Sequence, residues 1–117
     1  MGVSSMTERI KKGQVYMADL NPVRGSEQGG VRPVIIVQNN QGNMYSPTVI
    51  VAPLTSKNKK AIPTHVHLEA CSCKSDSTVL LEQIRTIDKS RLIEKIGEAT
   101  CEEMEKIDKA LRVSVDV

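Results

Sequence analysis

Apolar residues in this chain gather in short runs that are separated by polar and glycine-containing segments. Runs of about four to eight residues that are rich in Val, Ile and Thr and bounded by turn residues are typical of β-strands. The pattern predicts strands at 14–20, 33–38, 48–54, 64–68, 78–87 and 92–97. Pro53 is expected to bulge or end the third strand, because proline removes a backbone donor. The fourth strand is polar enough to lie at the edge of a sheet.

The connections between these strands are short. Asn and Gly cluster at 39–43, which predicts a turn, and 88–91 is expected to form a single helical turn. One clear helix follows at the end of the chain, where Thr100 and Glu103 form a capping box. Its apolar face consists of Met104, Ile107 and Leu111. Short strands with one terminal helix predict a small, strongly bent β-barrel with the helix packed on the sheet.

The composition is that of one small domain. The 117 residues are 39% hydrophobic and support a single core of Val, Ile, Leu and Met. We expect a loose N-terminal tail at 1–9, in which Met6 is an alternative start, and one domain over 10–117. No apolar run approaches the ~20 residues of a membrane span, and no signal segment opens the chain. A cytoplasmic protein without a membrane partner is therefore expected.

The charge balance limits the kind of nucleic-acid partner. Sixteen basic and fourteen acidic residues give a net charge of +2, which argues against a protein that coats duplex DNA. A small local basic site is still compatible with this balance. Tyr16 and Tyr45 are the only aromatic residues, so recognition of bases in a single strand would depend mainly on polar groups.

Cysteine and histidine raise the question of a bound metal. Three cysteines are an odd number, which argues against a disulfide framework and fits a reducing compartment. Four soft ligands lie close together in the sequence: His65, His67, Cys71 and Cys73. A Cys-x-Cys pair lacks the usual two-residue spacer of zinc sites, so we expect no metal and keep structural zinc as the alternative.

The segment 25–33 is the first candidate for a functional site. Its glycines let the backbone approach a ligand closely, and its polar side chains include Glu27 and Arg32. Arg32 stands at the mouth of the next strand, whose first φ is fixed by Pro33. Polar groups on a loop that a rigid strand supports are a common way to build a site. A glycine-rich hairpin loop with solvated charges is the simpler alternative.

Antiparallel pairing of the second and third strands would bring Arg32 and Thr55 to the same end. Glu82, Gln83 and Arg85 lie on a further predicted strand that could line the same groove. Arginine binds phosphate through two donors and stabilises the charge that develops in the transition state. Because RNA carries its own nucleophile, the 2′-hydroxyl, such a site suits metal-free cleavage of an RNA phosphodiester.

Several motifs then resemble one family. They include Gly-Ser-Glu-Gln-Gly-Gly-Val-Arg-Pro at 25–33 and Leu-Glu-Gln-Ile-Arg-Thr-Ile-Asp-Lys at 81–89. The other segments that carry the resemblance are 13–16, 18–22, 38–39, 46–48, 63–66 and 91–92. Together they resemble the MazF/PemK (Kid-like) toxins of type II toxin–antitoxin systems, and most of all the enzymes of Firmicutes-type bacteria.

The resemblance implies a fold and an activity. The fold would be a small SH3-like β-barrel of the CcdB/PemK type, mainly β with a C-terminal helix on the sheet. The activity would be ribosome-independent, metal-independent and cofactor-free cleavage of single-stranded mRNA at a short sequence, for which an ACA-containing motif is expected. The protein would form a homodimer and be neutralised by a cognate MazE-like antitoxin whose extended tail fills the RNA groove. DNA would be met only through the antitoxin complex.

The resemblance also assigns roles to residues. The catalytic Arg and Thr of the family fall on Arg32 and Thr55, and cleavage would leave a 2′,3′-cyclic phosphate and a 5′-hydroxyl. Arg32 would clamp the phosphorane and Thr55 would hold a phosphate oxygen. Because a guanidinium is not deprotonated in proteins, Glu27 and Glu82 are the candidate general bases, with recognition of a base edge as their alternative role. The expected RNA contacts are Ser26, Gln28, Gln83 and Arg85.

Two departures and three alternatives accompany this interpretation. The short segment 69–77 and Pro53, where close relatives tend to carry Ala, leave the cleavage sequence open. Gyrase-poisoning toxins share the barrel but depend on a C-terminal end with Trp, which this chain lacks. A non-catalytic binding module would call for aromatic pockets. A histidine nuclease would use His65 and His67 as acid and base.

Overall fold

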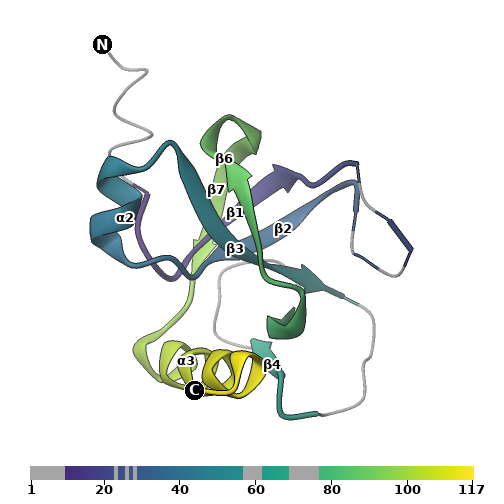
Figure 1. The fold of residues 1–117 in the computed structure, drawn as a ribbon, viewed down its shortest axis with the longest axis vertical. Helices are drawn as coiled ribbons and strands as arrows, with labels where there is room; N and C mark the ends of the chain where they lie inside the picture. The colour runs from purple at the N-terminus through teal and green to yellow at the C-terminus, as the bar shows by residue number, and fades with distance from the viewer. Residues whose placement is uncertain (1–9, 23, 26, 28, 57–61, 69–76) are drawn as a thin grey trace.

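The computed structural model describes residues 10–22, 24–25, 27, 29–56, 62–68 and 77–117. Within them the chain forms a mainly antiparallel β structure with a C-terminal helix (Figure 1). The elements in chain order are β1 (Gln14–Asp19), β2 (Val31–Ile36), α2 (Asn40–Tyr45), β3 (Thr48–Thr55), β4 (His65–Leu68), β5 (Ser77–Leu80), the 3-10 turn η1 (Leu81–Gln83), β6 (Arg85–Asp88), the 3-10 turn η2 (Lys89–Arg91), β7 (Leu92–Glu98) and α3 (Cys101–Val115). The predicted tail at 1–9 lies outside the described residues.

The sheet is organised around β3. The strand order is β4-β5-β3-β2-β1-β7, and β6 also pairs with β3. One edge of β3 pairs with β2, while the other edge pairs first with β6 and then with β5. The polar strand β4 lies at an edge, as its sequence predicts. Among the described helices, none is long and apolar enough to cross a membrane.

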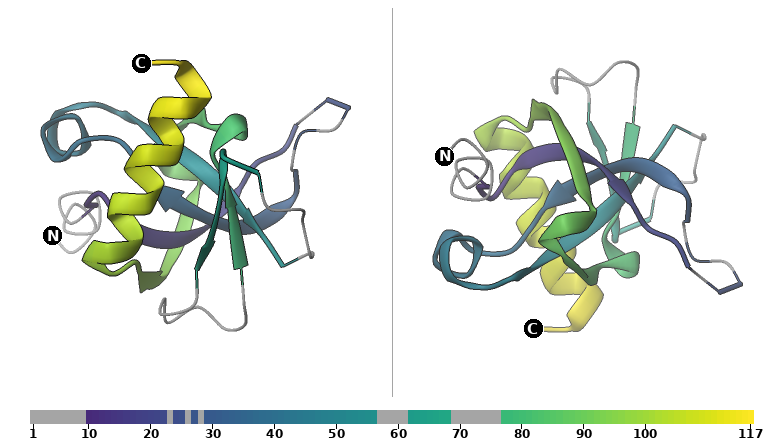
Figure 2. Two further views of the ribbon diagram at one scale, coloured as in Figure 1. Left: turned by 90° about the horizontal axis from the view of Figure 1, so that it is seen from below. Right: turned by 90° about the horizontal axis from the view of Figure 1, so that it is seen from above.

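Both faces of the central strands are buried. One face contributes Tyr16, Ala18, Val34, Ile36, Val49 and Val51 to a core with Ile87 and Leu92. The other face contributes Val15, Ile35, Ala52 and Leu54 to a second core with Ile107 and Ala110 of α3. The helix crosses this second face (Figure 2). Burial on both faces explains why β2 and its flank are apolar in a continuous run rather than in alternation.

The structure corrects the predicted end of the third strand. β3 continues through Pro53 to Thr55, so the prediction that Pro53 bulges or ends it is wrong. On the edge that changes partner, β3 pairs with β6 up to Val51 and with β5 from Leu54. Pro53 lies between these two residues, where neither partner strand takes a pair. A proline is tolerated in this inner strand because of that gap.

The predicted turn at 39–43 is also wrong. A short helix, α2, begins there, and Asn39 caps it by accepting a hydrogen bond from the Gly42 amide at 2.8 Å. Asn43 is fully buried and donates to the carbonyl of Gln38 at 3.0 Å. Asn and Gly are typical of turns, but here a cap and a satisfied buried amide make a helix.

The predicted strand 78–87 is two strands separated by η1, so Glu82 and Gln83 stand on a 3-10 turn. The reason is a difference in register on β3. The pair Leu54–Val79 belongs to β5 and the pair Val51–Arg85 belongs to β6. The step from Val51 to Leu54 on β3 is three residues, whereas the step from Val79 to Arg85 is six. The three residues of η1 take up the difference.

The remaining predictions for the last third of the chain are confirmed. η2 and β7 form as expected. The Thr100 hydroxyl accepts from the Glu103 amide at 3.1 Å, and the Glu103 carboxylate accepts from the Thr100 amide at 2.9 Å. Ile107 is fully buried, and α3 packs against β4 and η1. Lys12 also contacts Asp108 of the helix at 2.9 Å, which ties α3 to the approach of β1.

Candidate functional site

A groove of about 460 Å³ opens where three parts of the chain meet. They are the β1–β2 connection, β3 and the segment from η1 into β6. The described residues that line it are Glu27, Pro53, Glu82, Gln83, Ile84, Arg85 and Thr86. Four of these, from segments far apart in the sequence, are residues that the sequence singled out for chemistry. The fold therefore gathers two carboxylates, an amide and a guanidinium around one concave surface.

Arg32 and Thr55 lie at the end of the β2–β3 ladder. The last pair there joins Val34 to Pro53, and Arg32 and Thr55 each stand two residues beyond that pair. Pro53 lines the groove, so this end of the ladder borders it. Thr55 is 4% exposed, and Arg32 is half-buried with its Nε donating to the carbonyl of Gly29 at 2.7 Å. The two residues are placed at one end by antiparallel pairing, as the sequence predicts.

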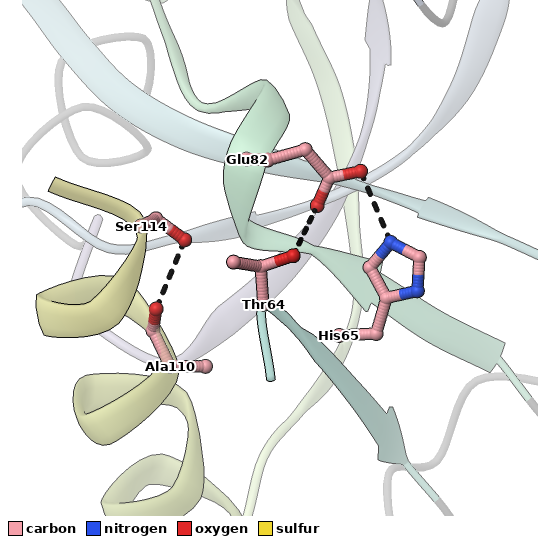
Figure 3. A network of polar contacts seen from close by, with 5 residues as sticks. All are labelled: Thr64, His65, Glu82, Ala110 and Ser114. Carbon is pink, nitrogen blue, oxygen red and sulfur yellow. Dashed lines mark hydrogen bonds and ion pairs between the residues drawn. The ribbon is translucent and has the colours of Figure 1, made fainter. Parts of the chain in front are cut away.

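The start of β4 holds the carboxylate of Glu82 (Figure 3). Thr64 Oγ1 donates to Glu82 Oε1 at 3.0 Å, and His65 Nε2 lies 3.0 Å from Glu82 Oε2. The β4–β5 register explains this contact, because His65 pairs with Leu80 and the Leu81 amide then donates to the Thr64 carbonyl at 2.9 Å. η1 is thereby fixed over the start of β4, and each oxygen of Glu82 has a partner there.

These contacts set the charge state of Glu82. Burial raises the pKa of its carboxyl, whereas several hydrogen bonds and the nearby imidazole lower it. The lowering effects together are larger, so the pKa of Glu82 lies below its ordinary value. The hydrogen bonds come from His65, from the backbone of Glu82 and from Thr64. A carboxylate with a lowered pKa is an anion at neutral pH and a weak proton acceptor.

Two arginines anchor the base of the β1–β2 connection. Arg85 Nη1 donates to the carbonyl of Leu20 at 2.9 Å. Arg91 Nη1 donates to the carbonyl of Asp19 at 3.0 Å and also to that of Asn21. Arg85, predicted as an RNA contact, thus lines the groove and also anchors the start of the β1–β2 connection.

Glu27 projects from the β1–β2 connection itself. Its Oε1 accepts from the amide of Arg24 at 3.1 Å, and its own amide donates to the carbonyl of Arg24 at 3.1 Å. Gly25 between them has φ +57°, a left-handed conformation that favours glycine. The turn presents an exposed carboxylate at the mouth of the groove. Ser26 and Gln28 lie outside the described residues, so their roles stay predictions.

Of the four candidate zinc ligands, only His65 and His67 are among the described residues. Among the described residues, no group of three or more His, Cys, Asp or Glu side chains is placed to hold a metal ion. His65 contacts Glu82 instead. Cys71 and Cys73 lie outside the described residues.

Sequence reasoning missed Thr64 and His65 as partners of Glu82, and Arg91 as an anchor of the β1–β2 connection. Each contact joins residues far apart in the sequence, so no local pattern reveals it. The available signal was the polar pair Thr64-His65 at the start of a predicted strand, which becomes informative once the pairing of that strand with β5 is known.

The chain matches, over residues 11–115, the family model described as a PemK-like, MazF-like toxin of type II toxin–antitoxin systems. It is 30% identical to an endoribonuclease from a mycobacterial species, with 92% of each chain covered and a TM-score of 0.77. It is 31% identical to a mycobacterial endoribonuclease in complex with its cognate antitoxin, with 92% and 96% covered and a TM-score of 0.79. MazF from Deinococcus radiodurans is 27% identical, with 92% and 97% covered and a TM-score of 0.81.

These matches bear on the predictions made from the sequence. The mainly β fold with a C-terminal helix is confirmed, because solved MazF and endoribonuclease structures share it over nearly the whole chain. The special likeness to Firmicutes-type enzymes stays a prediction. Since the family model covers nearly the whole described domain, the chain belongs to the PemK-like, MazF-like toxins of type II toxin–antitoxin systems.

Proposed function

We propose that this toxin is an endoribonuclease that cleaves single-stranded mRNA in the groove beside β3. The observation that carries the proposal is the meeting of Glu27, Glu82, Gln83 and Arg85 in one groove, which is bordered by the ladder end that bears Arg32. Two similar solved structures are endoribonucleases about as long as this chain, which supports the same activity.

The chemistry is an attack of the RNA 2′-oxygen on the adjacent phosphorus. A general base takes the 2′-hydroxyl proton, the bond from phosphorus to the 5′-oxygen breaks, and the leaving oxygen takes up a proton. The products are a 2′,3′-cyclic phosphate and a 5′-hydroxyl. Because the nucleophile belongs to the substrate, the protein has to orient the phosphate and stabilise its charge, and this route needs no metal or other cofactor.

Arg32 and Thr55 are suited to these two tasks. The guanidinium of Arg32 clamps the non-bridging oxygens of the phosphorane, and its Nε contact with Gly29 limits how far the group can move. The hydroxyl of Thr55 holds a phosphate oxygen from a nearly buried position in β3. Both groups come from paired strands, which keep them more rigid than loop residues.

The two glutamates take different roles. Glu82 is a weak base, because its pKa is lowered and both oxygens already accept hydrogen bonds. Its fixed carboxylate is suited to accept from the exocyclic amino group of an RNA base. Glu27 is exposed at the mouth of the groove and serves as the general base. Gln83 and Arg85 contact the RNA beside Glu82, and Ser26 and Gln28 contact it from the β1–β2 connection.

The cleaved sequence, the oligomeric state, the location and the partner are proposed from the resemblance of the sequence to the MazF/PemK toxins. The cleaved sequence contains ACA, the protein acts as a homodimer in the cytoplasm, and a MazE-like antitoxin covers the groove and links the toxin to DNA. One similar solved structure is an endoribonuclease in complex with its cognate antitoxin, which supports a partner of this kind. The described part of the chain offers no feature that favours a gyrase-poisoning toxin.

Arg32→Ala tests the proposal. Because loss of a group that stabilises developing charge costs about 10²- to 10³-fold in rate, we expect that loss in kcat on an ACA-containing RNA oligonucleotide. Arg112→Ala is the matched control, since Arg112 is an exposed arginine of α3 that is not among the described residues lining the groove. Analysis of the 3′ ends should find the cyclic phosphate. Cleavage by Arg32→Ala at the wild-type rate, or no RNA cleavage by the wild type, would refute the proposal.

A further inference from the structure

We propose that His65 is a positioning residue for sequence recognition, which fixes the orientation of the Glu82 carboxylate toward the base that it reads. This inference rests on the proposed function, because it concerns how the same groove distinguishes one RNA sequence from another. It gives His65 a task other than acid–base chemistry at the phosphate.

His65 and Glu82 differ in how deeply their side chains are buried. The side chain of His65 is 10% exposed, whereas that of Glu82 is 39% exposed. The imidazole is carried by β4, which is paired along its length with β5. A nearly buried ring on a paired strand has little freedom. It can therefore act as a fixed support for a carboxylate that reaches into the groove.

The carboxylate of Glu82 is held through both of its oxygens. An ionised glutamate has two oxygens with about four sites that accept hydrogen bonds. Thr64 occupies a site on Oε1, and His65 contacts Oε2, both at 3.0 Å. Two contacts on different oxygens fix the plane of the carboxylate as well as its position (Figure 3). The remaining acceptor sites are then presented to a base in one orientation.

His65 lies at a different cavity from the described groove residues. It is not among the described residues that line the groove. It lines a different cavity, of about 680 Å³, between β4 and α3. His65 therefore meets the described part of the groove through its contact with Glu82, which is the link between the imidazole and a groove residue.

The experiment measures discrimination between two RNA oligonucleotides. Cleavage by Glu82→Gln first identifies the nucleotide position at which the base preference changes from that of the wild type. The two RNAs differ only at that position. His65→Ala should lower the ratio of kcat/KM for the two RNAs about tenfold, because a well-oriented base contact contributes about 5- to 150-fold discrimination. His65→Gln, which can still donate to the carboxylate, should recover part of the ratio. His67→Ala is the matched control, since His67 is exposed on the same strand and lines the same second cavity.

A double variant distinguishes positioning from an independent role. If His65 acts through Glu82, the combination of His65→Ala with Glu82→Gln discriminates no worse than Glu82→Gln alone. Thr64→Val removes the other contact of the same carboxylate and tests the idea if His65→Ala does not fold, as judged by thermal melting. Multiplicative losses of discrimination in the double variant would overturn the proposed role of His65, and so would active His65 and Thr64 variants with wild-type discrimination. Neither result would affect the proposed function. A wild type that does not cleave RNA would overturn the proposed function as well.

Discussion

Glu27 and Glu82 are chemically identical side chains on one groove, and their surroundings separate them. Glu82 is held by Thr64 and His65, whereas Glu27 is exposed and contacts the backbone of Arg24. The sequence could predict that both glutamates belong to the site, because each lies in a motif with other polar groups. It could not predict their separate roles, because the partners of Glu82 come from a strand whose position depends on pairing with β5.

The lowered pKa of Glu82 predicts a dependence of stability on pH. Its carboxylate stabilises the folded chain above the ordinary pKa of about 4.5, and this contribution is lost as pH falls through the lowered folded value. Glu82→Gln should therefore make the free energy of unfolding fall less steeply below that pH. Urea unfolding at several acidic pH values measures the slope. Glu94→Gln, at an exposed position on β7, is the control, and equal slopes for Glu82→Gln and the wild type would contradict the assignment.

At the scale of elements, the sequence could predict what local pattern controls. The strands and α3 follow from apolar runs, turn residues and a capping box, and all of them form. The break at η1 could not be predicted, because 78–87 is compatible with one strand throughout. The break arises from two different registers on β3, which only the assembled sheet defines. α2 was missed because its cap residues are the same residues that form turns.

The capping box of α3 carries a prediction at this scale. Thr100→Ala removes the acceptor for the Glu103 amide and should lower the free energy of unfolding by about 1 kcal/mol. Thr100→Ser keeps a hydroxyl and should be nearly as stable as the wild type. Guanidinium unfolding measures both variants. RNA cleavage per folded molecule should stay unchanged, since Thr100 is not among the described groove residues. Equal stability of the Ala and Ser variants would show that the cap does not stabilise the fold.

At the scale of the whole molecule, two cores lie on opposite faces of one curved sheet, and the groove opens near the strand ends. The placement of Arg32 and Thr55 at the same end of the β2–β3 ladder could be predicted, since two adjacent apolar strands pair antiparallel most simply. The anchoring of the β1–β2 connection by Arg85 and Arg91 could not, because each guanidinium reaches a backbone carbonyl far away in the sequence.

The whole chain also provides the test of the zinc alternative. We expect no stoichiometric zinc in the purified protein, because the Cys-x-Cys spacing is unusual for zinc and His65 is engaged by Glu82. Dialysis against EDTA should leave the melting temperature and RNA cleavage unchanged. Elemental analysis supplies the metal content. One zinc per chain, with a melting temperature that falls on chelation, would establish the alternative instead.

The two registers that β5 and β6 keep on β3 impose a constraint on how this family member can change its length. A residue deleted from η1 would force one of the two strands to slip along β3, and a slip of one residue turns every side chain of that strand to the opposite face. In β6, for example, the buried Ile87 would then be exchanged for one of its exposed neighbours, Thr86 or Asp88. Length variation in evolution should therefore avoid the turn that carries Glu82, so that this wall of the groove changes by substitution alone.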